Sequence, residues 1–524
     1  MNGSAYMKKK PQDVSDDAAG CIDILEQIVP CCIVKTKDED GNLKKCIHVE
    51  LLKQLISKDL TDAHEAYEFS WVGKKAAFVE ANQPTSHLLS ACPEESRDWD
   101  TTENFYIEGE NLEALKLLQS EYRQKIKMIY IDPPYNTGND FVYQDNFYSE
   151  IDGCVSKIGM ADKIFSQKSA NNELSARLHS RWCSMMYSRL MLARELLRDD
   201  GVIFISIDDH ELKNLMHLCD EIFGERHFIG CISRATGTTT GQGAHRIGSS
   251  LDYCLAYAKS GQFVLNRIVL NAKDHRRFNR RDNRGRYSRL QLRKTGSADR
   301  REDRPNMFYP VTAPDSTDVY PVGPKDYLSR WRVKAETYQK LLQEGLIEWK
   351  KNNDEHISPV VDGYTRSVWT PYVKYYLKGR TKQVSNLFDD LEGNKKASLE
   401  LKALLGVKGV FDNPKPVAFI ERLIQIATDK NDLILDFFSG SATTAHAVMQ
   451  YNARNKTRHR FILVQSPEVC HAKSAACKAG YATIWDIGRE RLRRAGDRIL
   501  KQYQGSEMLD VGFRVLKVIE GQND

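Results

Sequence analysis

The sequence predicts an α/β fold in which a doubly wound sheet is interrupted by an inserted domain. Three observations lead to this prediction. Short apolar runs of the kind found in buried parallel strands recur along the chain. Helical patterns of apolar residues stand between these runs. The alternation stops at about residue 260 and resumes at about residue 405, so a separate domain is expected between these points.

The expected elements follow from apolar spacing. A helical pattern opens at Asn111-Leu112, and the apolar run after it stops at two prolines, which end a strand. Apolar runs and helical patterns occur both before and after the insert. We expect strands at 127–131, 202–207, 252–259, 433–438 and 461–466, and helices at 181–198, 417–428 and 441–452. Residues 22–28 and 51–56 also have helical spacing, on either side of a charged turn at 37–42.

These patterns divide the chain into five parts. They are an N-terminal region (1–100), the first part of the α/β core (101–259), the insert (260–405), the second part of the core (406–500) and a C-terminal tail (501–524).

Composition excludes several classes of protein. The chain has 524 residues with a net charge of +5, and no apolar run approaches the roughly 18 residues of a membrane span. The N-terminus has lysines but no apolar stretch behind them, so it is not a secretory signal. The 12 cysteines form no CxxC pair. Cys470, His471 and Cys477 could be part of a metal site, but scattered reduced thiols in a cytoplasmic protein are favoured, and we expect no metal.

Basic charge is concentrated in one segment. Residues 271–304 contain 13 Lys/Arg and 5 Asp/Glu, a local charge of +8 that leaves −3 for the rest of the chain. Phe278 and Tyr287 are interleaved with the basic residues. Arginine neutralises phosphates and can read guanine edges, so this segment is predicted to contact DNA, with a solvated charged loop as the alternative. The candidate DNA-binding residues are Arg276, Arg277, Arg280, Arg281, Arg284 and Arg286.

A candidate catalytic group follows the strand expected at 127–131. Asp132 supplies carboxylate acceptors, Pro133 and Pro134 stiffen the backbone and leave carbonyls free to accept, and Tyr135 offers an aromatic face. Ligand sites of open α/β sheets lie at the carboxyl ends of strands. Two acceptors beside a stacking surface suit the exocyclic amino group of a planar base. The alternative is a proline-stiffened turn without a catalytic role.

A candidate cofactor turn follows the strand expected at 433–438. The segment Asp436 to Thr444 runs from a buried strand through small residues into a helix, and free N–H groups there would favour an anionic group. It is neither GxGxxG nor a P-loop, so a nucleotide-like ligand without a triphosphate, such as S-adenosylmethionine, fits better. Glu468, after the next strand, could accept from ribose hydroxyls. The alternatives are a turn that only connects the strand to the helix, and a Glu468 side chain that is solvated at the surface.

These motifs resemble a known family. IKMIYIDPPYNTGNDFVYQD (126–145) followed by LILDFFSGSATTAHAV (433–448) is similar to β-class amino methyltransferases, in which the catalytic tetrapeptide precedes the cofactor loop. Segments between residues 69 and 496, outside the insert, resemble the modification (Mod) subunit of Type III restriction–modification systems. The resemblance implies a Rossmann-like mixed sheet with circularly permuted motif order and an inserted target-recognition domain.

The resemblance also implies residue roles. Asp132, Pro133, Pro134 and Tyr135 would hold a flipped base, and an initial Asp points to adenine N6 over cytosine N4. The remaining matching positions would bind S-adenosylmethionine, with the segment that begins at Asn413 and Pro414 closing over it. These cofactor residues are Glu110, Asn111, Asn413, Pro414, Asp436, Phe438, Ser439, Gly440, Ser441, Thr443, Thr444 and Glu468.

Two positions depart from the family pattern. Glu110 stands where the family usually has Asp, which adds a methylene between the carboxylate and the backbone. Ala442 replaces the second glycine of the cofactor loop. Alanine is tolerated if this residue has helical dihedral angles and is costly if its φ must be positive.

The expected function is methylation of adenine N6 in duplex DNA by the modification and specificity subunit of a Type III system. The resemblance implies a homodimer and a restriction (helicase–nuclease) subunit on another chain. Two alternatives stay open: a solitary adenine-N6 or cytosine-N4 methyltransferase, and a catalytically silent DNA-specificity subunit.

Overall fold

The computed structural model describes residues 33–37, 43–47, 68–137, 167–237, 248, 250–324, 326–352, 363–364, 367–503 and 509–521. These residues form two compact units. One comprises Met1–Leu265 with Ser385–Asp524, and the other is Asn266–Val384. The helical spacing expected at 22–28 and 51–56 lies outside the described residues. The antiparallel strands β1 (Ile33–Lys37) and β2 (Leu43–Ile47) are described, but residues 38–42 of the expected charged turn lie outside the described residues.

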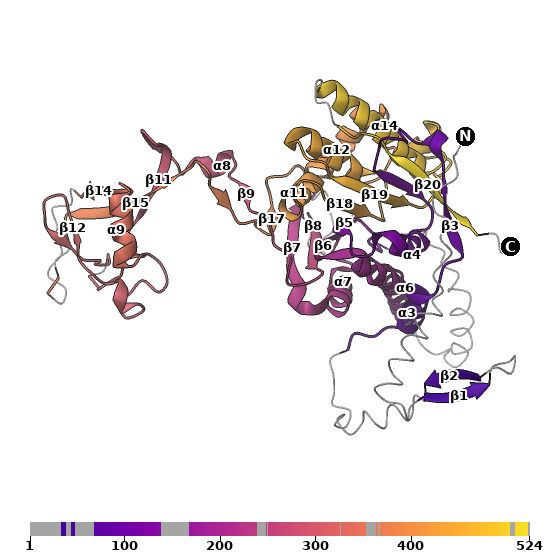
Figure 1. The fold of residues 1–524 in the computed structure, drawn as a ribbon, viewed down its shortest axis with the longest axis horizontal. Coiled ribbons are helices and arrows are strands. Elements are labelled where there is room, and N and C mark those ends of the chain that lie inside the picture. Colours follow the sequence, from indigo (N-terminus) through magenta and orange to yellow (C-terminus); the bar gives the residue numbers. More distant parts are fainter. Residues whose placement is uncertain are drawn as a thin grey trace. The chain divides into compact units, whose positions relative to one another are not determined.

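A ten-stranded mixed sheet forms the frame of the first unit, in the order β17-β7-β8-β6-β5-β18-β19-β4-β20-β3 (Figure 1). Its centre is parallel, from β6 to β20, while β8 is antiparallel to both of its neighbours and β3 is antiparallel to β20. The strands are β3 (His87–Ala91), β4 (Phe105–Glu108), β5 (Ile126–Ile131), β6 (Leu197–Ile207), β7 (Phe228–Ala235), β8 (Leu251–Ala258), β17 (Leu387–Phe388), β18 (Leu433–Asp436), β19 (Arg460–Gln465) and β20 (Arg514–Glu520). The predicted α/β fold with a mixed sheet is confirmed.

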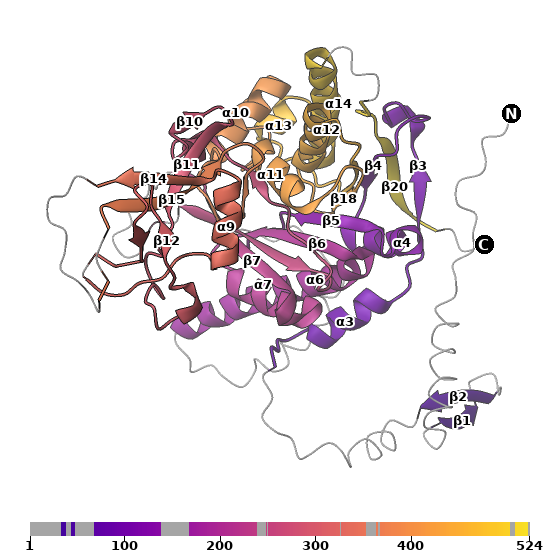
Figure 2. The same cartoon turned by 60° about the vertical axis from the view of Figure 1, so that its left-hand side comes forward.

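Two groups of helices cover the sheet, one on each face (Figures 1 and 2). In the first group α4 and α3 pack on α6, which also contacts α7; in the second, α12 packs between α11 and α14, and α10 packs on α14. The first group is α3 (Lys74–Asn82), α4 (Asn111–Tyr122), α6 (Gln167–Leu196) and α7 (Leu212–Cys219). The second group is α10 (Asn394–Leu405), α11 (Val417–Ala427), α12 (Thr443–Asn455) and α14 (Ile484–Gln502), with the short α13 (Ala475–Lys478) before α14.

Burial on both faces explains the apolar runs of the central strands. All six residues of β5 are buried, and Ile129 and Ile131 pack with Leu435 of β18 in the core under α4, α6 and α7. Lys127 is the exception within this apolar run: its ammonium donates to the carboxylate and backbone of Asp200. Such strands must be nearly uniform in hydrophobicity because neither of their faces meets water.

Two of the expected elements end two residues earlier than predicted. The strand expected to reach residue 438 ends at Asp436, whose carboxylate accepts from the Phe438 N–H at 3.0 Å and turns the chain. The helix expected to run to residue 198 ends at Leu196, and β6 begins at once with Leu197.

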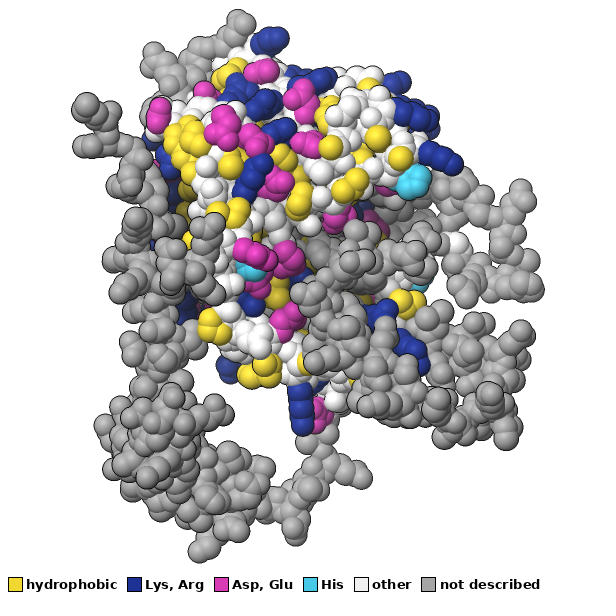
Figure 3. All heavy atoms as spheres, turned by 90° about the vertical axis from the view of Figure 1, so that its right-hand side faces the viewer, with side chains coloured by type: hydrophobic (Ala, Val, Ile, Leu, Met, Phe, Trp, Pro, Cys, Tyr) yellow, Lys and Arg dark blue, Asp and Glu magenta, His cyan; other side chains and the backbone are white. Residues whose placement is uncertain are grey.

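The edge of the sheet uses residues on either side of the expected core. β3 lies within the expected N-terminal region, and β20 lies within the expected C-terminal tail. β20 pairs with β4 in parallel and with β3 in the antiparallel sense, so both segments belong to the sheet. Figure 3 views the molecule from the right-hand side of Figure 1, the side of β3 and β20, and shows acidic, basic and apolar side chains intermixed among the coloured atoms. Lys517 on this edge is paired with Glu95 and Glu108.

The second unit, residues 266–384, falls within the range expected for the insert. Its antiparallel sheet has the order β10-β11-β15-β14, and Trp331, Leu292 and Val373 lie in its core. Its elements are β9 (Ile268–Val269), α8 (Ala272–His275), β10 (Arg280–Asp282), β11 (Gly285–Gln291), β12 (Val311–Thr312), β13 (Asp318–Val319), α9 (Ala335–Gln343), β14 (Ile347–Lys351), β15 (Trp369–Tyr376) and β16 (Thr381–Lys382). Across the described part of the chain, every helix is too short or too polar to cross a membrane.

Candidate active site

The candidate site lies at the carboxyl ends of β5 and β18, which are adjacent and parallel. From β5 the chain passes through α6 to β6 on one side, and from β18 it passes through α12 to β19 on the other. Such a reversal of strand order opens a crevice at the ends of the strands. A cavity of about 490 Å³ occupies this position.

The cavity brings together eight of the predicted site residues from segments far apart in the sequence. These eight are Asp132, Pro133, Pro134, Tyr135, Asn413, Phe438, Gly440 and Glu468. The other predicted cofactor residues do not line it. They are Glu110, Asn111, Pro414, Asp436, Ser439, Ser441, Thr443 and Thr444, and several of them hold the lining residues in place.

Asp132 and Tyr135 form one hydrogen-bonded group at the end of β5. The Tyr135 hydroxyl donates to Asp132 Oδ1 at 3.0 Å. Burial raises the pKa of Tyr135, and the neighbouring Asp132 carboxylate adds to this effect, so the phenol keeps its proton and acts as the donor. The Lys415 ammonium donates to both oxygens of Asp132 at 2.6 Å, a contact that nothing in the sequence indicated.

The two proline carbonyls are not equivalent. The indole N–H of Trp182, on α6, donates to the Pro134 carbonyl at 2.6 Å. The Pro134 carbonyl therefore already has a donor, whereas no donor to the Pro133 carbonyl occurs among the described residues. Trp182 is fully buried, and its place in the apolar stripe of the helix suggested only a core residue.

A polar cluster fixes the backbone just after the tetrapeptide. Asn136 has φ of 57°, in the left-handed region that costs energy for most residues. Its side-chain amide donates to the buried carboxylate of Glu211 at 2.5 Å. His179 Nδ1 lies 2.6 Å from the same carboxylate, and Asn214 donates to it at 2.7 Å. These contacts between α6, α7 and the loop hold Asn136 in its uncommon conformation.

The cofactor turn is held by hydrogen bonds within itself and to β19. The N–H of Phe438 donates to Asp436, that of Ser439 to Val464, that of Gly440 to the side chain of Gln465, and that of Ala442 to Ser439. These four groups are already satisfied, so the expectation that free N–H groups here attract an anion is wrong for them. Helix α12 begins only at Thr443, after the turn has closed on itself.

Asp436 lies beneath the turn. It is 2% exposed, and Thr444 Oγ1 donates to its second oxygen at 2.5 Å. Burial raises the pKa of Asp436 to about 7, because two hydrogen bonds only partly replace the lost hydration. Asp436 and Thr444 therefore brace the loop from below.

The two small residues of the turn have positive φ. Gly440 has φ of +51°, and a Cβ atom at this position would lie 2.9 Å from Phe411 Cζ. Glycine is thus needed both for the dihedral angle and for the close approach of the Phe411 ring. Ala442 has φ of 60° and ψ of 39°, so it occupies the left-handed conformation in which alanine is disfavoured.

Arg491 of α14 fixes the far side of the turn. Its guanidinium is 1% exposed and donates to the backbone and hydroxyl oxygens of Ser441 and to Thr443 Oγ1, at 2.7–3.3 Å. Burial lowers the pKa of Arg491 to about 10, so it stays charged at neutral pH. Ser441 and Thr443 therefore anchor the loop to α14. Arg491 lies in the IGRERLRRAG segment, but nothing in the sequence distinguished it from its neighbouring arginines.

Glu110 and Asn111 share a buried arginine. Arg189 of α6 donates to Glu110 Oε1 and to Asn111 Oδ1, both at 2.6 Å. The second Glu110 oxygen caps α4 by accepting from the Glu113 N–H, and the Asn111 amide donates to the Phe437 carbonyl. The extra methylene of Glu110 is thus accommodated in a network that joins α4, α6 and the end of β18.

The charge of the cavity favours a cationic ligand. Its lining contains five carboxylates, Asp132, Asp208, Asp252, Asp412 and Glu468, against the single ammonium of Lys415. Burial raises the pKa of Glu468 above its usual range. The aromatic rings of Tyr135, Phe411 and Phe438 also line the cavity and can face a cation.

The predicted DNA-binding arginines lie on the second unit. Arg276, Arg277, Arg281, Arg284 and Arg286 are exposed, whereas Arg280 pairs with Glu348 at 3.1 Å. The interleaved aromatic residues do not offer stacking surfaces, because Phe278 and Tyr287 are 1% and 7% exposed and belong to the interior. The aromatic positions of this segment stabilise the fold of the unit.

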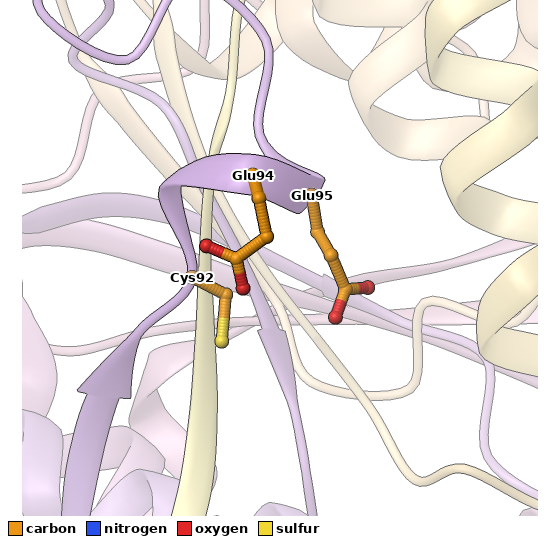
Figure 4. Close-up of side chains that lie close together, drawn as sticks. All are labelled: Cys92, Glu94 and Glu95. Carbon is orange, nitrogen blue, oxygen red and sulfur yellow. The ribbon is translucent and has the colours of Figure 1, made fainter.

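One group of possible metal ligands occurs among the described residues: Cys92, Glu94 and Glu95 (Figure 4). It lies after β3, and its residues do not line the cavity described above. Glu95 is paired with Arg489 and Lys517, so its charge is already compensated. We assign no metal to this group.

Comparison with known proteins gives consistent matches. Residues 126–472 match the family model described as DNA methylase. The Type III restriction-modification enzyme StyLTI Mod subunit of Salmonella typhimurium is 31% identical over 469 residues, which cover 88% of this chain and 68% of that protein. The EcoPI Mod subunit of Escherichia phage P1 is 32% identical, covering 90% and 74%. The Type II methyltransferase M.KpnI of Klebsiella pneumoniae is 33% identical, covering 76% and 88%.

Proposed function

This chain belongs to the DNA methylase family that includes the Mod subunits of Type III restriction–modification systems, and from this premise we propose that it methylates adenine N6 in duplex DNA. It is a site-specific DNA methyltransferase, and its methyl donor is S-adenosylmethionine. The proposal of adenine rests on one observation: a carboxylate and an aromatic ring, Asp132 and Tyr135, form a joint group at the cavity where β5 ends.

The cavity fits the donor in charge. S-adenosylmethionine carries a cationic sulfonium, and the lining is predominantly acidic. Gly440 lets the Phe411 ring approach the turn closely, because a Cβ atom here would lie 2.9 Å from Phe411 Cζ. Glu468 would accept from the ribose hydroxyls, while Phe438 and Gly440 would line the methionine end. When bound, the donor supplies a methyl group activated by the positive charge on sulfur.

The residues at the end of β5 would then position the target amine. Tyr135 would stack on the flipped base, and flipping costs roughly a few kcal/mol. Asp132 and the Pro133 carbonyl would each accept one hydrogen of the amino group. An amino nitrogen whose hydrogens are held in this way becomes more pyramidal and directs its lone pair at the methyl group. Orientation of two bound reactants can contribute roughly 7–11 kcal/mol.

Sequence readout would belong to the second unit. Five of its predicted arginines are exposed and can neutralise phosphates. The relatives named as Type III Mod subunits favour association with a restriction subunit on another chain and a homodimer of this chain. A silent specificity subunit is less favoured, because Asp132 and Tyr135 are both present at the cavity.

The test is a methyl-transfer assay. Purified protein is incubated with tritiated S-adenosylmethionine and whole-genome-amplified DNA, which carries no methylation, and the digested nucleosides are separated. Label in N6-methyladenine supports the proposal. Label in N4-methylcytosine contradicts the base assignment, and no label supports a silent subunit.

Asp132→Ala is the control for this assay. It should lower the rate of transfer at least about 100-fold, as loss of a charge-stabilising contact commonly does. Binding of S-adenosylmethionine should stay within a few fold of the wild type. A loss of cofactor binding as large as the loss of rate would show that Asp132 serves the cofactor instead of the base.

A further inference from the structure

Lys415 is a nearly buried cation for which the proposed chemistry has no role. It precedes α11, in the Asn413–Pro416 segment that was expected to close over the cofactor. The side chain is 6% exposed, and its Nζ donates to Asp132 Oδ1 and Oδ2, both at 2.6 Å. The segment that was expected to close over the cofactor thus contacts Asp132, the carboxylate that was predicted to bind the base.

This contact limits how Asp132 can bind a ligand. A carboxylate accepts hydrogen bonds at about four positions, two on each oxygen. Lys415 occupies one position on each oxygen, and the Tyr135 hydroxyl occupies the second on Oδ1. One position remains, on Oδ2. The contact therefore selects the oxygen that can accept from an incoming amino group.

The surroundings of Lys415 hold it in place. Its Nζ lies 4.0 Å from Asp252 Oδ2, and Arg234 donates to that same oxygen at 2.7 Å. Arg234 is itself held by Asn394 at 2.8 Å. Lys415 thus separates two carboxylates that would otherwise repel each other. It also lies 5.0 Å from the centre of the Tyr135 ring, so it contacts both members of the hydrogen-bonded pair.

We propose that Lys415 is a positioning residue for methyl transfer: its ammonium holds the Asp132 carboxylate in one orientation and leaves Oδ2 for the amino group of the base. The proposal rests on the proposed function. Lys415 acts through Asp132 and Tyr135, the residues assigned to the base. It therefore affects the rate of transfer and not the binding of the methyl donor.

The first experiment separates rate from binding. Lys415→Met keeps the length of the side chain but removes the charge, and we expect kcat on whole-genome-amplified DNA to fall about 100-fold. The Kd for S-adenosylmethionine, measured by equilibrium dialysis, should change less than threefold. Lys415→Arg can still donate to both oxygens and should retain more activity than Lys415→Met. Lys408→Met is the matched control on an exposed lysine and should behave as the wild type.

The second experiment is chemical rescue. Lys415→Ala opens space beside Asp132 that a small ammonium ion can enter. Ethylamine should restore part of kcat in a concentration-dependent and saturable way, and potassium chloride at equal ionic strength should not. Thermal unfolding of each variant identifies any that fails to fold; Lys415→Arg, which keeps the charge, then provides the measurement.

The outcomes are distinct from those of the proposed function. If the wild-type protein does not methylate DNA, the proposed function fails. If the wild type is active and Lys415→Met stays within threefold of it, the role of Lys415 is overturned. Parallel loss of cofactor binding, rescue by potassium chloride equal to that by ethylamine, or no rescue by ethylamine would overturn it as well.

Discussion

Ala442 sits at the most constrained point of the cofactor turn. Its left-handed conformation is forced by the turn between β18 and α12, and its side chain is fully buried. Alanine in this conformation carries backbone strain that glycine would avoid. The hydrogen bonds that Arg491 makes to Ser441 and Thr443 on either side hold the strained residue in place.

Ala442→Gly should therefore stabilise the protein. A non-glycine residue in the left-handed region costs roughly 1–2 kcal/mol, and we expect the free energy of unfolding to rise by about 1 kcal/mol. Ala447→Gly is the matched control, because Ala447 is equally buried and lies in the interior of α12. The free energy of unfolding of this variant should fall by about 1 kcal/mol. Denaturant titration of both variants measures the effect, and equal losses at both positions would contradict it.

Asp436 should make the stability of the protein depend on pH. Burial raises its pKa to about 7 from an ordinary value of 3.8, so the folded state holds this proton more tightly than the unfolded state does. The stabilisation is complete below about pH 4 and is lost as pH rises towards 7. The change amounts to about 4 kcal/mol at most, at 1.36 kcal/mol per pKa unit.

Asp436→Asn, which cannot titrate, isolates this contribution. Between pH 4.5 and pH 7.5 the wild type should lose stability relative to the variant, by an amount that grows with pH. Chemical unfolding at several pH values measures the difference. If stability depends on pH in the same way in the wild type and the variant, the pKa of Asp436 is ordinary and its carboxylate is better hydrated than its burial implies.

Among the secondary-structure elements, the segment from the end of α8 to β11 carries the charge that the sequence assigned to DNA. Arg276 and Arg281 are exposed, whereas Arg280 between them is paired with Glu348. The double variant Arg276→Gln/Arg281→Gln should weaken DNA binding. It should also reduce the slope of log K against log salt by about 2, at roughly 0.9 per phosphate contact.

Arg280→Gln is the control for this measurement. It removes one positive charge next to Arg281 on β10, but Arg280 is already paired with Glu348, so the slope should change little. Fluorescence anisotropy with labelled duplex DNA at several salt concentrations gives the slopes. An unchanged slope in the double variant would mean that this segment is only a solvated surface.

For the chain as a whole, we expect a dimer in which one copy reads the DNA while the other modifies it. Light scattering tests this: a mass near twice the 59.9 kDa of the chain supports a dimer. A mixture of an Asp132→Ala chain with a chain lacking the exposed arginines should recover methylation if reading and chemistry are divided between subunits. A single-chain mass with full activity would rule the dimer out.

The sequence by itself determined the fold class and the main elements. Buried parallel strands must be uniformly apolar, and the helices between them must have one apolar face, so β5, β18, β19, α11 and α12 could be located from periodicity alone. Asp132, Tyr135, Gly440 and Glu468 were also predicted as site residues, because strand ends in such sheets form ligand sites, and all four line the cavity. The positions of β3 and β20 were not, since edge strands join a sheet through backbone pairing that side-chain patterns reveal poorly.

Only the tertiary structure decided which polar residues touch the ligand cavity and which support it. Lys415 meets Asp132 across 283 positions of sequence, and Arg491 meets Ser441 across 50. The identity of a lysine or arginine does not reveal whether its side chain is solvated or buried. Its partner depends on how distant strands and helices pack. The strain at Ala442 is decided in the same way, because its φ depends on the closure of the turn against α14.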